Sequence, residues 1–486
     1  MKKKLFSLLA MLLSLVMILS ACGGKTDDDG KTDDPDNGLP KVDVTDYDEE
    51  AAKLTVDTEI DGVMVPAGRI PVRYWCPHGT GTSKNLDEIA INKFNESQDK
   101  YYVIRTYQGG YYDQLAKLQA TEQADLPALV NSSSETVGSY LHSGLIVPVQ
   151  NYIDADSTYV DPKLYGNLVA TYGLNGELIG HPMSLSLSGF FYNVDVFEKA
   201  GIDPFSIVSM DDVYAAVEKI CKGGFAKYGI AEEHSGIWAN YAFHRAGYYT
   251  VDNNNGMDGL PTKCLYDDNT NGFADVVTKY YTHWKNISDN GYLYPFGSKM
   301  KEDLIPALGR GELAMLVTTN SYQANVIDAF GDNTDGFGFV PMFSADAKGK
   351  NSGYCSSGQG LFVIDNGNKA AQMGAWEFIK FFSAPDVQVE WDKKTGYLPL
   401  SEAIYNSDAY QAYLKDYPYV QKIIDAMKGA DLSAFYAFTA TNNTYSPAGA
   451  TALEEIFNGT PVADAIATMV STINEDFELY NATNVG

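Results

Sequence analysis

The chain has 486 residues, too many for one small domain, so two or three domains are expected. Its formal net charge of −28 argues against nucleic acid and anionic membrane surfaces as partners. It has 34 tyrosines and few arginines, which favours contact with neutral polar molecules over phosphates, although tyrosine richness is also common in exported proteins.

The N-terminus has the parts of a secretion signal. Lys2, Lys3 and Lys4 precede an apolar run, residues 5–19, that is short for a membrane span. Leu19-Ser20-Ala21-Cys22 then resembles the lipobox of bacterial lipoproteins, whose cysteine is acylated and becomes the new N-terminus. We therefore expect a signal peptide over residues 1–21 and a lipid on Cys22 that anchors the protein on the extracellular face of the cell membrane. The alternative is an ordinary secretory signal with a chance cysteine.

Residues 22–50 are mostly Asp, Gly, Lys, Thr and Pro. A segment with so few large apolar side chains cannot offset its conformational entropy by burial, and its like charges repel one another. We expect a disordered acidic tether here, and we exclude residues 1–50 from the fold.

Four cysteines follow Cys22, and none forms a CxxC pair or a zinc spacing. They are Cys76, Cys221, Cys264 and Cys355. A disulfide such as Cys221–Cys264 stays open, because sequence does not reveal pairing. We expect no metal and no cofactor. The histidines do not have the spacing of metal ligands. Residues 267–272 begin like an EF-hand loop, but Thr278 stands where the bidentate glutamate is needed, so we interpret this segment as a turn.

The first folded segments alternate between strand and helix patterns. We expect strands at 70–76, 101–107 and 128–131, and helices at 85–95 and 112–123, the first opened by Asn85 with Glu88 at the capping-box position. This order calls for a parallel sheet with helices on its faces. Ligands bind beyond the carboxyl ends of such strands, which here means the loops 78–83, 108–111 and 131–135.

The alternation resumes further along the chain, which indicates a second α/β unit. We expect strands at 189–193, 313–317 and 336–340, and helices at 211–221 and 369–382. Two units of this size predict two lobes.

Several short motifs occur in series between about residues 70 and 465. They are Asn92–Asn95 with Tyr107–Tyr111, His181–Pro182 with Phe191–Asn193, Phe197–Gly201, Gly311–Met315, and Phe378–Pro385 with Trp391–Pro399. Each motif alone is weak. Together they resemble the bacterial extracellular solute-binding proteins of the sugar and glycerol-phosphate type.

The resemblance implies an α/β, periplasmic-binding-protein-like fold of type II, with two lobes, a hinge and a ligand cleft between the lobes. By analogy the chain crosses between lobes near 181–184, returns near 343–348 and crosses again after Tyr397. The lobes would then comprise residues 51–182 plus 347–397 and residues 183–346 plus 398–486.

The resemblance also implies a function. We expect a lipid-anchored, monomeric substrate-binding protein of an ABC importer that delivers a carbohydrate to the transmembrane permease subunits without covalent chemistry. Members that bind glycerol phosphate supply a late arginine, and the corresponding residues 435–447 contain neither Arg nor Lys. This favours a neutral mono- or oligosaccharide, although lysines or helix N-termini could hold a phosphate.

The motifs suggest a set of ligand-contacting residues, for each of which core packing is the alternative. They are Tyr111, Glu135, Ser186 or Ser188, Trp238, Thr319, Asn320, Ser357 with Gly358, and Tyr397.

Two other classes of function stay open. A glycan-active hydrolase would need a carboxylate pair, which cannot be picked out among 63 acidic residues, and the chain has no GxSxG, HExxH or P-loop motif. An adhesin or sensory protein that binds a sugar without an importer would have the same sequence features.

Overall fold

The computed structural model describes residues 39–233, 236–333, 335–346, 353–431 and 434–484. The expected signal peptide, Cys22 and the tether up to residue 38 lie outside them. The last part of the expected tether differs from the prediction: Leu39 and Val44 are buried, and the Val42 N–H donates to the Asn151 side chain at 2.9 Å. The packed chain therefore includes residues 39–50, because two apolar side chains in this acidic stretch find core positions.

Nine strands of the described residues form one mixed sheet with the order β10-β11-β9-β13-β5-β3-β4, in which β12 also pairs with β9 and β6 with β13. Their bounds are β3 Ile70–Cys76, β4 Tyr101–Tyr107, β5 Leu129–Ser133, β6 Ile146–Val147, β9 His181–Asn193, β10 Tyr228–Glu232, β11 Leu313–Thr319, β12 Phe337–Pro341 and β13 Ser356–Ile364. Two short hairpins lie apart from it: β1 (Thr58–Ile60) with β2 (Val63–Val65), and β7 (Gly173–Leu174) with β8 (Glu177–Leu178).

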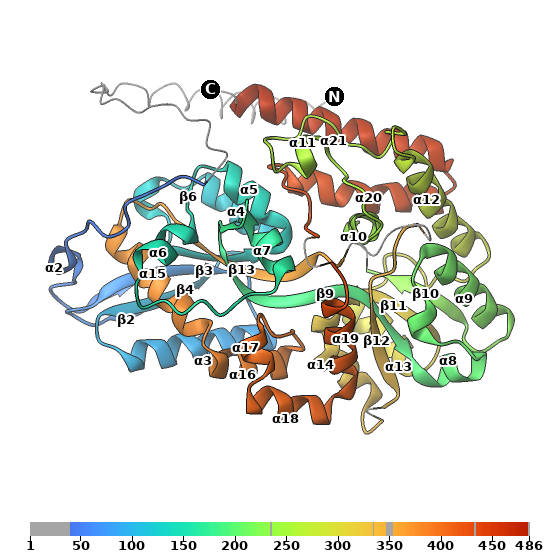
Figure 1. Ribbon diagram of the computed structural model, residues 1–486, viewed down its shortest axis with the longest axis horizontal. Coiled ribbons are helices and arrows are strands. Elements are labelled where there is room, and N and C mark those ends of the chain that lie inside the picture. Colours follow the sequence, from blue (N-terminus) through green and yellow to red (C-terminus); the bar gives the residue numbers. More distant parts are fainter. Residues whose placement is uncertain (1–38, 234–235, 334, 347–352, 432–433, 485–486) are drawn as a thin grey trace. The chain divides into compact units, whose positions relative to one another are not determined.

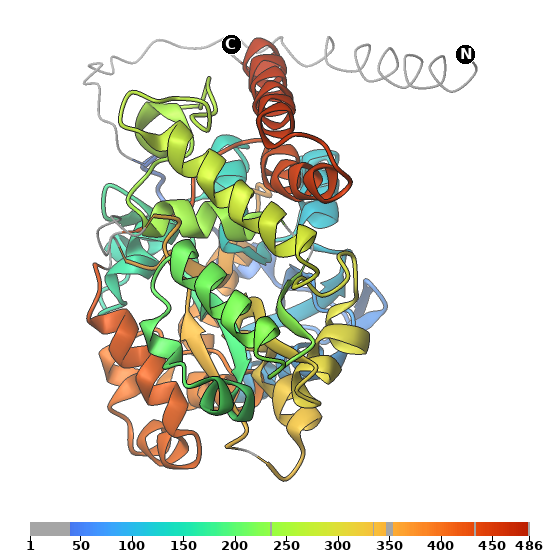
Figure 2. The ribbon, with the colours of Figure 1, turned by 90° about the vertical axis from the view of Figure 1, so that its right-hand side faces the viewer.

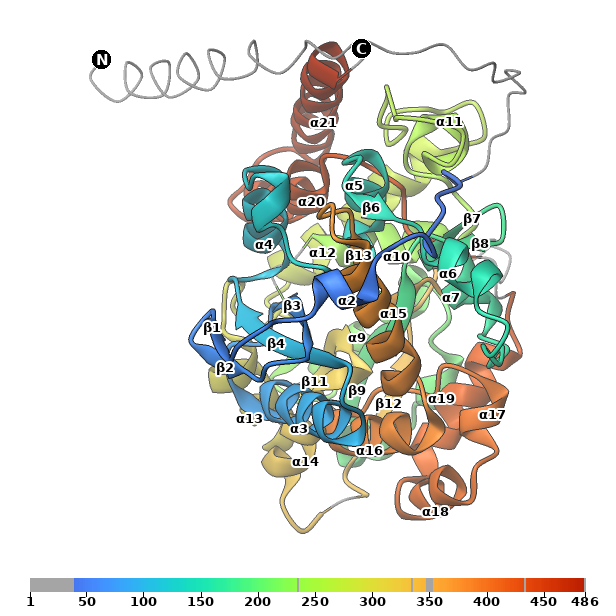
Figure 3. The same cartoon turned by 90° about the vertical axis from the view of Figure 1, so that its left-hand side faces the viewer.

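The first lobe has the predicted β-α-β-α-β arrangement, because β3 pairs in parallel with both β4 and β5. Period-2 alternation gives β3 two buried faces. Val72 and Tyr74 pack under α3 (Gly81–Ser97) and α15 (Lys369–Phe382), whereas Trp75 joins the cluster that contains α4 (Tyr111–Gln119). Figure 3 shows this lobe from its own side, and α15 packs on β3 and β4.

The start of α3 differs from the prediction. The helix begins at Gly81 after Thr80, not at Asn85, so Asn85 and Glu88 do not form its cap. Asp87 is instead buried and contacts His78, which leads into the site. The predicted helix at 112–123 is shorter than expected, and the predicted strands at 70–76 and 101–107 are confirmed.

The second lobe is built on β9, β10, β11 and β12. Helix α9 (Met210–Lys222) packs on β10 and begins with a capping box of Ser209 and Asp212. Helix α12 (Phe273–Asp289) packs on α9 and on the C-terminal helices α20 (Asn442–Phe457) and α21 (Val462–Asn484). Figure 2 faces this lobe, with α20 and α21 in red. Its core includes Phe243, Tyr280 and Trp284.

One long strand joins the two lobes. The predicted strand 189–193 is the second half of β9, a 13-residue strand that is visible as a single arrow in Figure 1. Its first half pairs with β13, ending at Leu187 opposite Ser356, and from Ser188 onward it pairs with β11 and β12. The crossing therefore lies within β9, a few residues beyond the predicted 181–184.

The remaining helices cover the two lobes and their junction. Their bounds are α2 Glu49–Ala52, α5 Val137–His142, α6 Val149–Ala155, α7 Gly166–Tyr172, α8 Val194–Ala200, α10 Ile237–Arg245, α11 Asp252–Asn255, α13 Ile305–Gly309, α14 Gln323–Phe330, α16 Pro385–Thr395, α17 Glu402–Tyr405, α18 Asp408–Asp416 and α19 Pro418–Lys428. No helix of the described residues is both long and apolar enough to cross a membrane.

Candidate ligand-binding site

The loops after β3 and β4 meet the middle of β13 at Gln359. The register of β13 against β9 shifts between Gln359 and Gly360, an irregularity of the kind that redirects a side chain. Gln359 Nε2 lies 2.7 Å from His78 Nε2 and 2.7 Å from the Tyr111 hydroxyl. His78 Nδ1 lies 2.6 Å from Asp87 Oδ2. These four side chains form a connected polar chain, which we call the Gln359 relay.

The directions of the hydrogen bonds in the Gln359 relay follow from the chemistry of its members. The His78 Nδ1–H donates to the Asp87 carboxylate, so His78 Nε2 accepts from the Gln359 amide. The second amide hydrogen goes to the Tyr111 oxygen, which leaves the Tyr111 O–H as a donor. Gln359 Oε1 is buried and has no partner among the described residues. The relay therefore holds one buried, unmatched acceptor beside one donor, the pair that a hydroxyl group can satisfy.

Glu135 lies among tyrosine hydroxyls. The Tyr241 O–H donates to Glu135 Oε1 at 2.8 Å, and Ser357 Oγ donates to the Tyr241 oxygen at 3.0 Å. Burial raises the pKa of Tyr241 well above its usual range, and the Glu135 charge adds to this. Burial and then Glu135 also raise the pKa of Tyr112. The carboxylate thus brings together rings from α4 and α10, which lie in different lobes.

Tyr397 is placed by the turn that ends α16. Gly396 has φ 82° and so close an approach to the Gln323 side chain that an added Cβ would lie 2.6 Å from it. The Tyr397 ring lies nearly parallel to that of Trp391, with centroids 6.5 Å apart. Burial raises the pKa of Tyr397 to about 12, and hydrogen bonds with Ser184 and Ser321 oppose that rise. This half-buried ring offers a flat surface beside the relay.

Two other residues of the predicted ligand-contacting set make structural contacts within the protein. Asn320 accepts from the Leu187 N–H at 2.7 Å and donates to the Gly396 carbonyl at 2.5 Å, so its amide joins β9 to the Tyr397 turn. Gly358 has φ 125°, and a Cβ there would lie 2.3 Å from the Ser184 carbonyl oxygen. These two residues hold the crossing strands together.

Three further residues of that set also contact other parts of the protein: Ser186, Trp238 and Thr319. Ser186 is buried opposite Ser357 in the β9–β13 ladder. Trp238 is 4% exposed and donates its indole N–H to the Glu233 carbonyl, so it packs in the second lobe. The Thr319 hydroxyl lies 2.6 Å from that of Ser321. Of the predicted ligand-contacting set, the structure brings Tyr111, Glu135 and Tyr397 together.

The sequence analysis missed Gln359 and Tyr241. Gln359 follows the predicted Ser357-Gly358 pair directly, but nothing in the sequence marks the bulge that turns it toward His78. Tyr241 lies three residues after Trp238 on α10, so helical spacing alone could have placed both rings on one face.

The segment 434–442 passes between the lobes. Ser139 Oγ on α5 donates to the Thr439 and Ala440 carbonyls at 3.1 and 3.0 Å. Asn442 donates to the Tyr112 hydroxyl at 3.1 Å. A Cβ at Gly138 would lie 2.5 Å from the Thr439 nitrogen, so the absence of a side chain permits this approach. We call residues 434–442 the interlobe strap.

Comparison with known proteins fits this architecture. A family model described as bacterial extracellular solute-binding protein matches residues 90–418. The chain belongs to this family. As a solute-binding protein it has the fold expected from the sequence, an α/β, periplasmic-binding-protein-like fold of type II with two lobes and a hinge.

Two kinds of relative match this solute-binding protein. The sn-glycerol-3-phosphate-binding periplasmic protein UgpB of Yersinia pestis bv. Antiqua (strain Antiqua) is 27% identical over 356 residues, which cover 71% of this chain and 78% of that protein. The structure of a cyclic alpha-maltosyl-1,6-maltose binding protein from Arthrobacter globiformis matches with a TM-score of 0.64 at 20% identity, covering 84% of this chain and 99% of that one.

A third match is the structure of UgpB from Mycobacterium tuberculosis in complex with glycerophosphocholine. Its TM-score is 0.65 at 17% identity, and it covers 86% of this chain and 99% of that chain.

Within the described residues of the solute-binding protein, no group of three or more His, Cys, Asp or Glu could hold a metal ion. The described cysteines are all free: Cys76, Cys221, Cys264 and Cys355. The Cys221–Cys264 disulfide that the sequence left open is therefore not formed.

Proposed function

We propose that this protein is the substrate-binding component of an ABC importer and that it captures a neutral mono- or oligosaccharide between its lobes. A lipid on Cys22 would hold it at the extracellular face of the membrane, where it would deliver the sugar, as a monomer, to the permease subunits. No bond of the ligand is broken in this proposal. We also retain as a proposal the two-lobe division 51–182 plus 347–397 and 183–346 plus 398–486, with the first lobe extended to include residues 39–50 and its first boundary moved to the crossing between Leu187 and Ser188.

The observation that carries the proposal is the Gln359 relay. A sugar hydroxyl both donates and accepts, and the relay offers the Gln359 Oε1 acceptor beside the Tyr111 O–H donor. The Glu135 carboxylate can accept hydrogen bonds from further hydroxyls of the sugar. The half-buried Tyr397 ring can pack against the apolar face of a pyranose. A site with neutral donors, a carboxylate acceptor and an aromatic surface fits a polyol better than an anion.

Glycerol phosphate is the second candidate, because it is named for the relative with 27% identity. A phosphate needs cations, and two arginines close to the site already contact groups of the protein. Arg105 contacts the His78 carbonyl and lies 3.6 Å from Asp87, and Arg245 lies over the Tyr354 ring at 4.0 Å. Residues 435–447, where the resemblance places the arginine of glycerol-phosphate binders, contain neither arginine nor lysine. These contacts support the neutral ligand.

A thermal-shift and calorimetry screen of residues 23–486 tests the proposal. The probes are mono- and oligosaccharides, glycerol 3-phosphate and glycerophosphocholine, since a ligand that binds only the folded state raises the melting temperature. We expect a saturable shift with a sugar that is recovered intact, and loss of the shift in Tyr397→Ala. A shift with the phosphate compounds alone would reject the neutral ligand, and cleavage of the sugar would reject the binding protein in favour of a hydrolase.

The anchor has its own test in cells. Cys22→Ser should release the protein from the membrane fraction and abolish incorporation of labelled fatty acid, whereas Cys221→Ser, a cysteine in α9, should change neither. A wild-type protein that is released from the cell without labelled fatty acid would favour the ordinary secretory signal.

A further inference from the structure

A cavity of about 280 Å³ lies in the second lobe, where β12 meets the start of α19. These two elements pack against each other and can be found side by side in Figure 1. Tyr192 of β9 is part of its wall, and it comes eight residues after Ser184, the strand partner of Gln359. At about 3.3 Å per residue, this places the cavity about 26 Å along the strand from the Gln359 relay. It is therefore separate from the candidate ligand-binding site.

Aromatic rings form much of the wall of this cavity. The Tyr419 ring meets the Phe337 ring at 67° with centroids 5.4 Å apart, and it meets the Tyr417 ring at 88° with centroids 6.5 Å apart. Rings at such angles turn their faces in different directions, as in the cages that hold organic cations. The aromatic residues among the described residues that line the cavity are Tyr192, Phe205, Phe337, Phe339, Tyr417 and Tyr419.

Gly338 makes room for one of these rings. It is paired with Tyr192 between β12 and β9, and a Cβ on it would lie 2.4 Å from the Tyr192 hydroxyl oxygen. The Tyr192 ring therefore lies across the glycine. Burial and then the nearby Asp203 charge raise the pKa of Tyr192, so negative charge acts on this wall.

The charges at the cavity favour a cation. Asp335 and Asp416 line it and are exposed, and Lys422 is the one basic side chain among its described lining residues. Tyr417 caps both the C-terminus of α18 and the N-terminus of α19, so the opposite partial charges of these two helix ends largely cancel. The carboxylates therefore determine the sign of the local potential, in a chain whose net charge is −28.

Lys422 shows that these walls accept a positive charge. Its ammonium lies over the Phe205 ring, 5.7 Å from the ring centroid. The side chain is exposed, and the cavity of about 280 Å³ remains beside it. A primary ammonium is strongly hydrated and needs acceptors, whereas a quaternary ammonium carries methyl groups that can contact ring faces directly. The quaternary group therefore fits these walls better.

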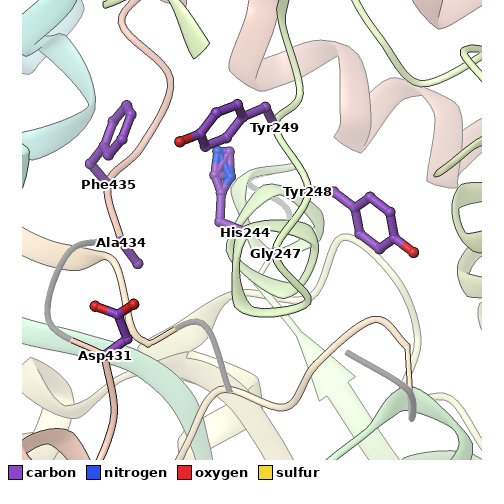
Figure 4. Close-up of a pocket in the computed structure, with 7 residues that line it drawn as sticks. All are labelled: His244, Gly247, Tyr248, Tyr249, Asp431, Ala434 and Phe435. Atoms are coloured by element: carbon purple, nitrogen blue, oxygen red, sulfur yellow. The ribbon is translucent and has the colours of Figure 1, made fainter. Parts of the chain in front are cut away.

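A smaller cavity beside α10 offers a comparison. It has a volume of about 170 Å³, and Tyr249 and Phe435 contribute their rings to it (Figure 4). Tyr248 turns its ring away and stacks it on Phe273 at 4.8 Å. This cavity has fewer rings and one aspartate, Asp431, among its described lining residues, so it serves below as the control position.

We propose that the cavity between β12 and α19 binds a quaternary ammonium group, with the methyl groups against Tyr192, Phe205 and Tyr417 and the charge facing Asp335 and Asp416. The proposal does not depend on the proposed function, because this ligand binds away from the cleft. Both a free small molecule and a lipid headgroup can carry such a group, and the experiments below separate these two sources.

Three matched compounds test the recognition by calorimetry on residues 23–486. Choline has both the charge and the methyl groups, ethanolamine keeps the charge without the methyl groups, and dimethylbutanol has a carbon atom in place of the choline nitrogen. We expect choline to bind at least about tenfold more tightly than either analogue. Absence of choline binding, or equal binding of either analogue, would overturn the proposal.

Substitutions in the wall locate the binding. Asp416→Asn, at an exposed position, and Tyr417→Leu should each weaken choline binding by about fivefold or more, with melting temperatures measured for both. Asp408→Asn makes the same charge change at the exposed first residue of α18, and Tyr249→Ala removes a ring from the smaller cavity. Both controls should bind choline as wild type does. Wild-type affinity in Asp416→Asn and Tyr417→Leu would reject the site.

Two further variants exclude a general loss of structure and binding in the cleft. Lys422→Met removes a competing cation and uncovers the Phe205 ring, so choline should bind about threefold more tightly or better. A damaged fold would not raise the affinity, and unchanged or weaker binding would contradict the proposal. Tyr397→Ala should keep choline binding while it loses the sugar. Loss of choline binding in this variant would place choline in the cleft and reject the cavity, leaving the proposed function intact.

Phosphatidylcholine vesicles separate the two sources of the ligand. Co-sedimentation of residues 23–486 that is lost in Asp416→Asn would identify a lipid headgroup. Choline binding without co-sedimentation would identify a free small molecule, and binding of neither would reject the proposal.

Discussion

On the first-lobe side of the cleft, Gln359 gives one amide hydrogen to His78 and the other to Tyr111, and Asp87 fixes the histidine behind them. On the second-lobe side, α10 presents rings: Tyr241 reaches Glu135, and Tyr436 packs between Tyr241 and His244. Hydrogen bonds have direction, whereas ring stacking tolerates many ligands. The first-lobe side of the cleft, which we call the first wall, should therefore determine which arrangement of ligand hydroxyls binds. The second-lobe side, which we call the second wall, should contribute contact area.

The backbone beneath the first wall should show the largest effect. Gly358→Ala places a Cβ against the Ser184 carbonyl at a φ of 125°, so we expect the free energy of unfolding to fall by about 3 kcal/mol or more. Gly429→Ala, at a helix end with φ −80°, is the control. Denaturant unfolding of both variants provides the measurement, and equal stability would contradict the tight crossing of β9 and β13.

A buried carboxyl lies behind the second wall, at the end of β10. Burial raises the pKa of Glu232 from its usual 4.5 to about 8, so the folded state holds a proton that the unfolded state releases above pH 4.5. This group therefore lowers stability as pH rises from about 4.5 to 8. At 1.36 kcal/mol per pKa unit, Glu232→Gln should stabilise the protein by up to about 3 kcal/mol at pH 7.

The pH dependence distinguishes this effect from a packing change. The stabilisation by Glu232→Gln should fall close to zero at pH 4.5, where the wild-type side chain is protonated in the folded state and half protonated in the unfolded state. Melting curves at pH 4.5 and pH 7 measure it. An equal effect at both values would show that the charge is not the cause.

Removing the amide of the first wall should affect binding more than stability. Gln359→Leu leaves His78 Nε2 without its donor and removes the acceptor Oε1, so we expect the affinity for the ligand to fall about 100-fold, or about 2.7 kcal/mol. Calorimetry with the best ligand of the screen measures the loss. A change in affinity below about threefold would show that the Gln359 relay is not part of the binding site.

The smallest effect is expected on the second wall. Tyr241→Phe keeps the ring but removes the hydroxyl that donates to Glu135, so affinity should fall by about tenfold at most. Its selectivity among sugars of different stereochemistry should change less than that of Gln359→Leu. If Tyr241→Phe changes selectivity more, the contrast between the two walls is wrong.

The sequence predicted those parts of the fold that depend on neighbouring residues. The β-α-β-α-β order from Ile70 to Ser133 follows from period-2 and period-3.6 patterns, and the structure confirms it. The start of α3 was misplaced because Asn85 and Glu88 look like a capping box, whereas Asp87 between them is held by His78. The sequence pattern of residues 85–88 holds no information about the contact between Asp87 and His78.

The site was predictable only in part for the same reason. Tyr111 and Tyr397 lie on turns that short motifs mark, so they could be placed from the sequence. Gln359 depends on a bulge between strands whose residues are 175 positions apart, and Asn320 looks like a ligand residue until its amide is seen joining Leu187 to Gly396. Whether a polar side chain serves the ligand or the backbone depends on such distant partners.

The arrangement of β9 and β13 also determines when this protein can fold. Strand β13 lies between β5 and β9 in the sheet, yet its residues come 223 positions after the end of β5 at Ser133. During synthesis the first lobe lacks this central strand until Ile364 has emerged, and pairing over such separations is slow. A nascent chain of this solute-binding protein therefore stays incompletely folded for most of its synthesis, which is the state required for threading through a narrow export channel.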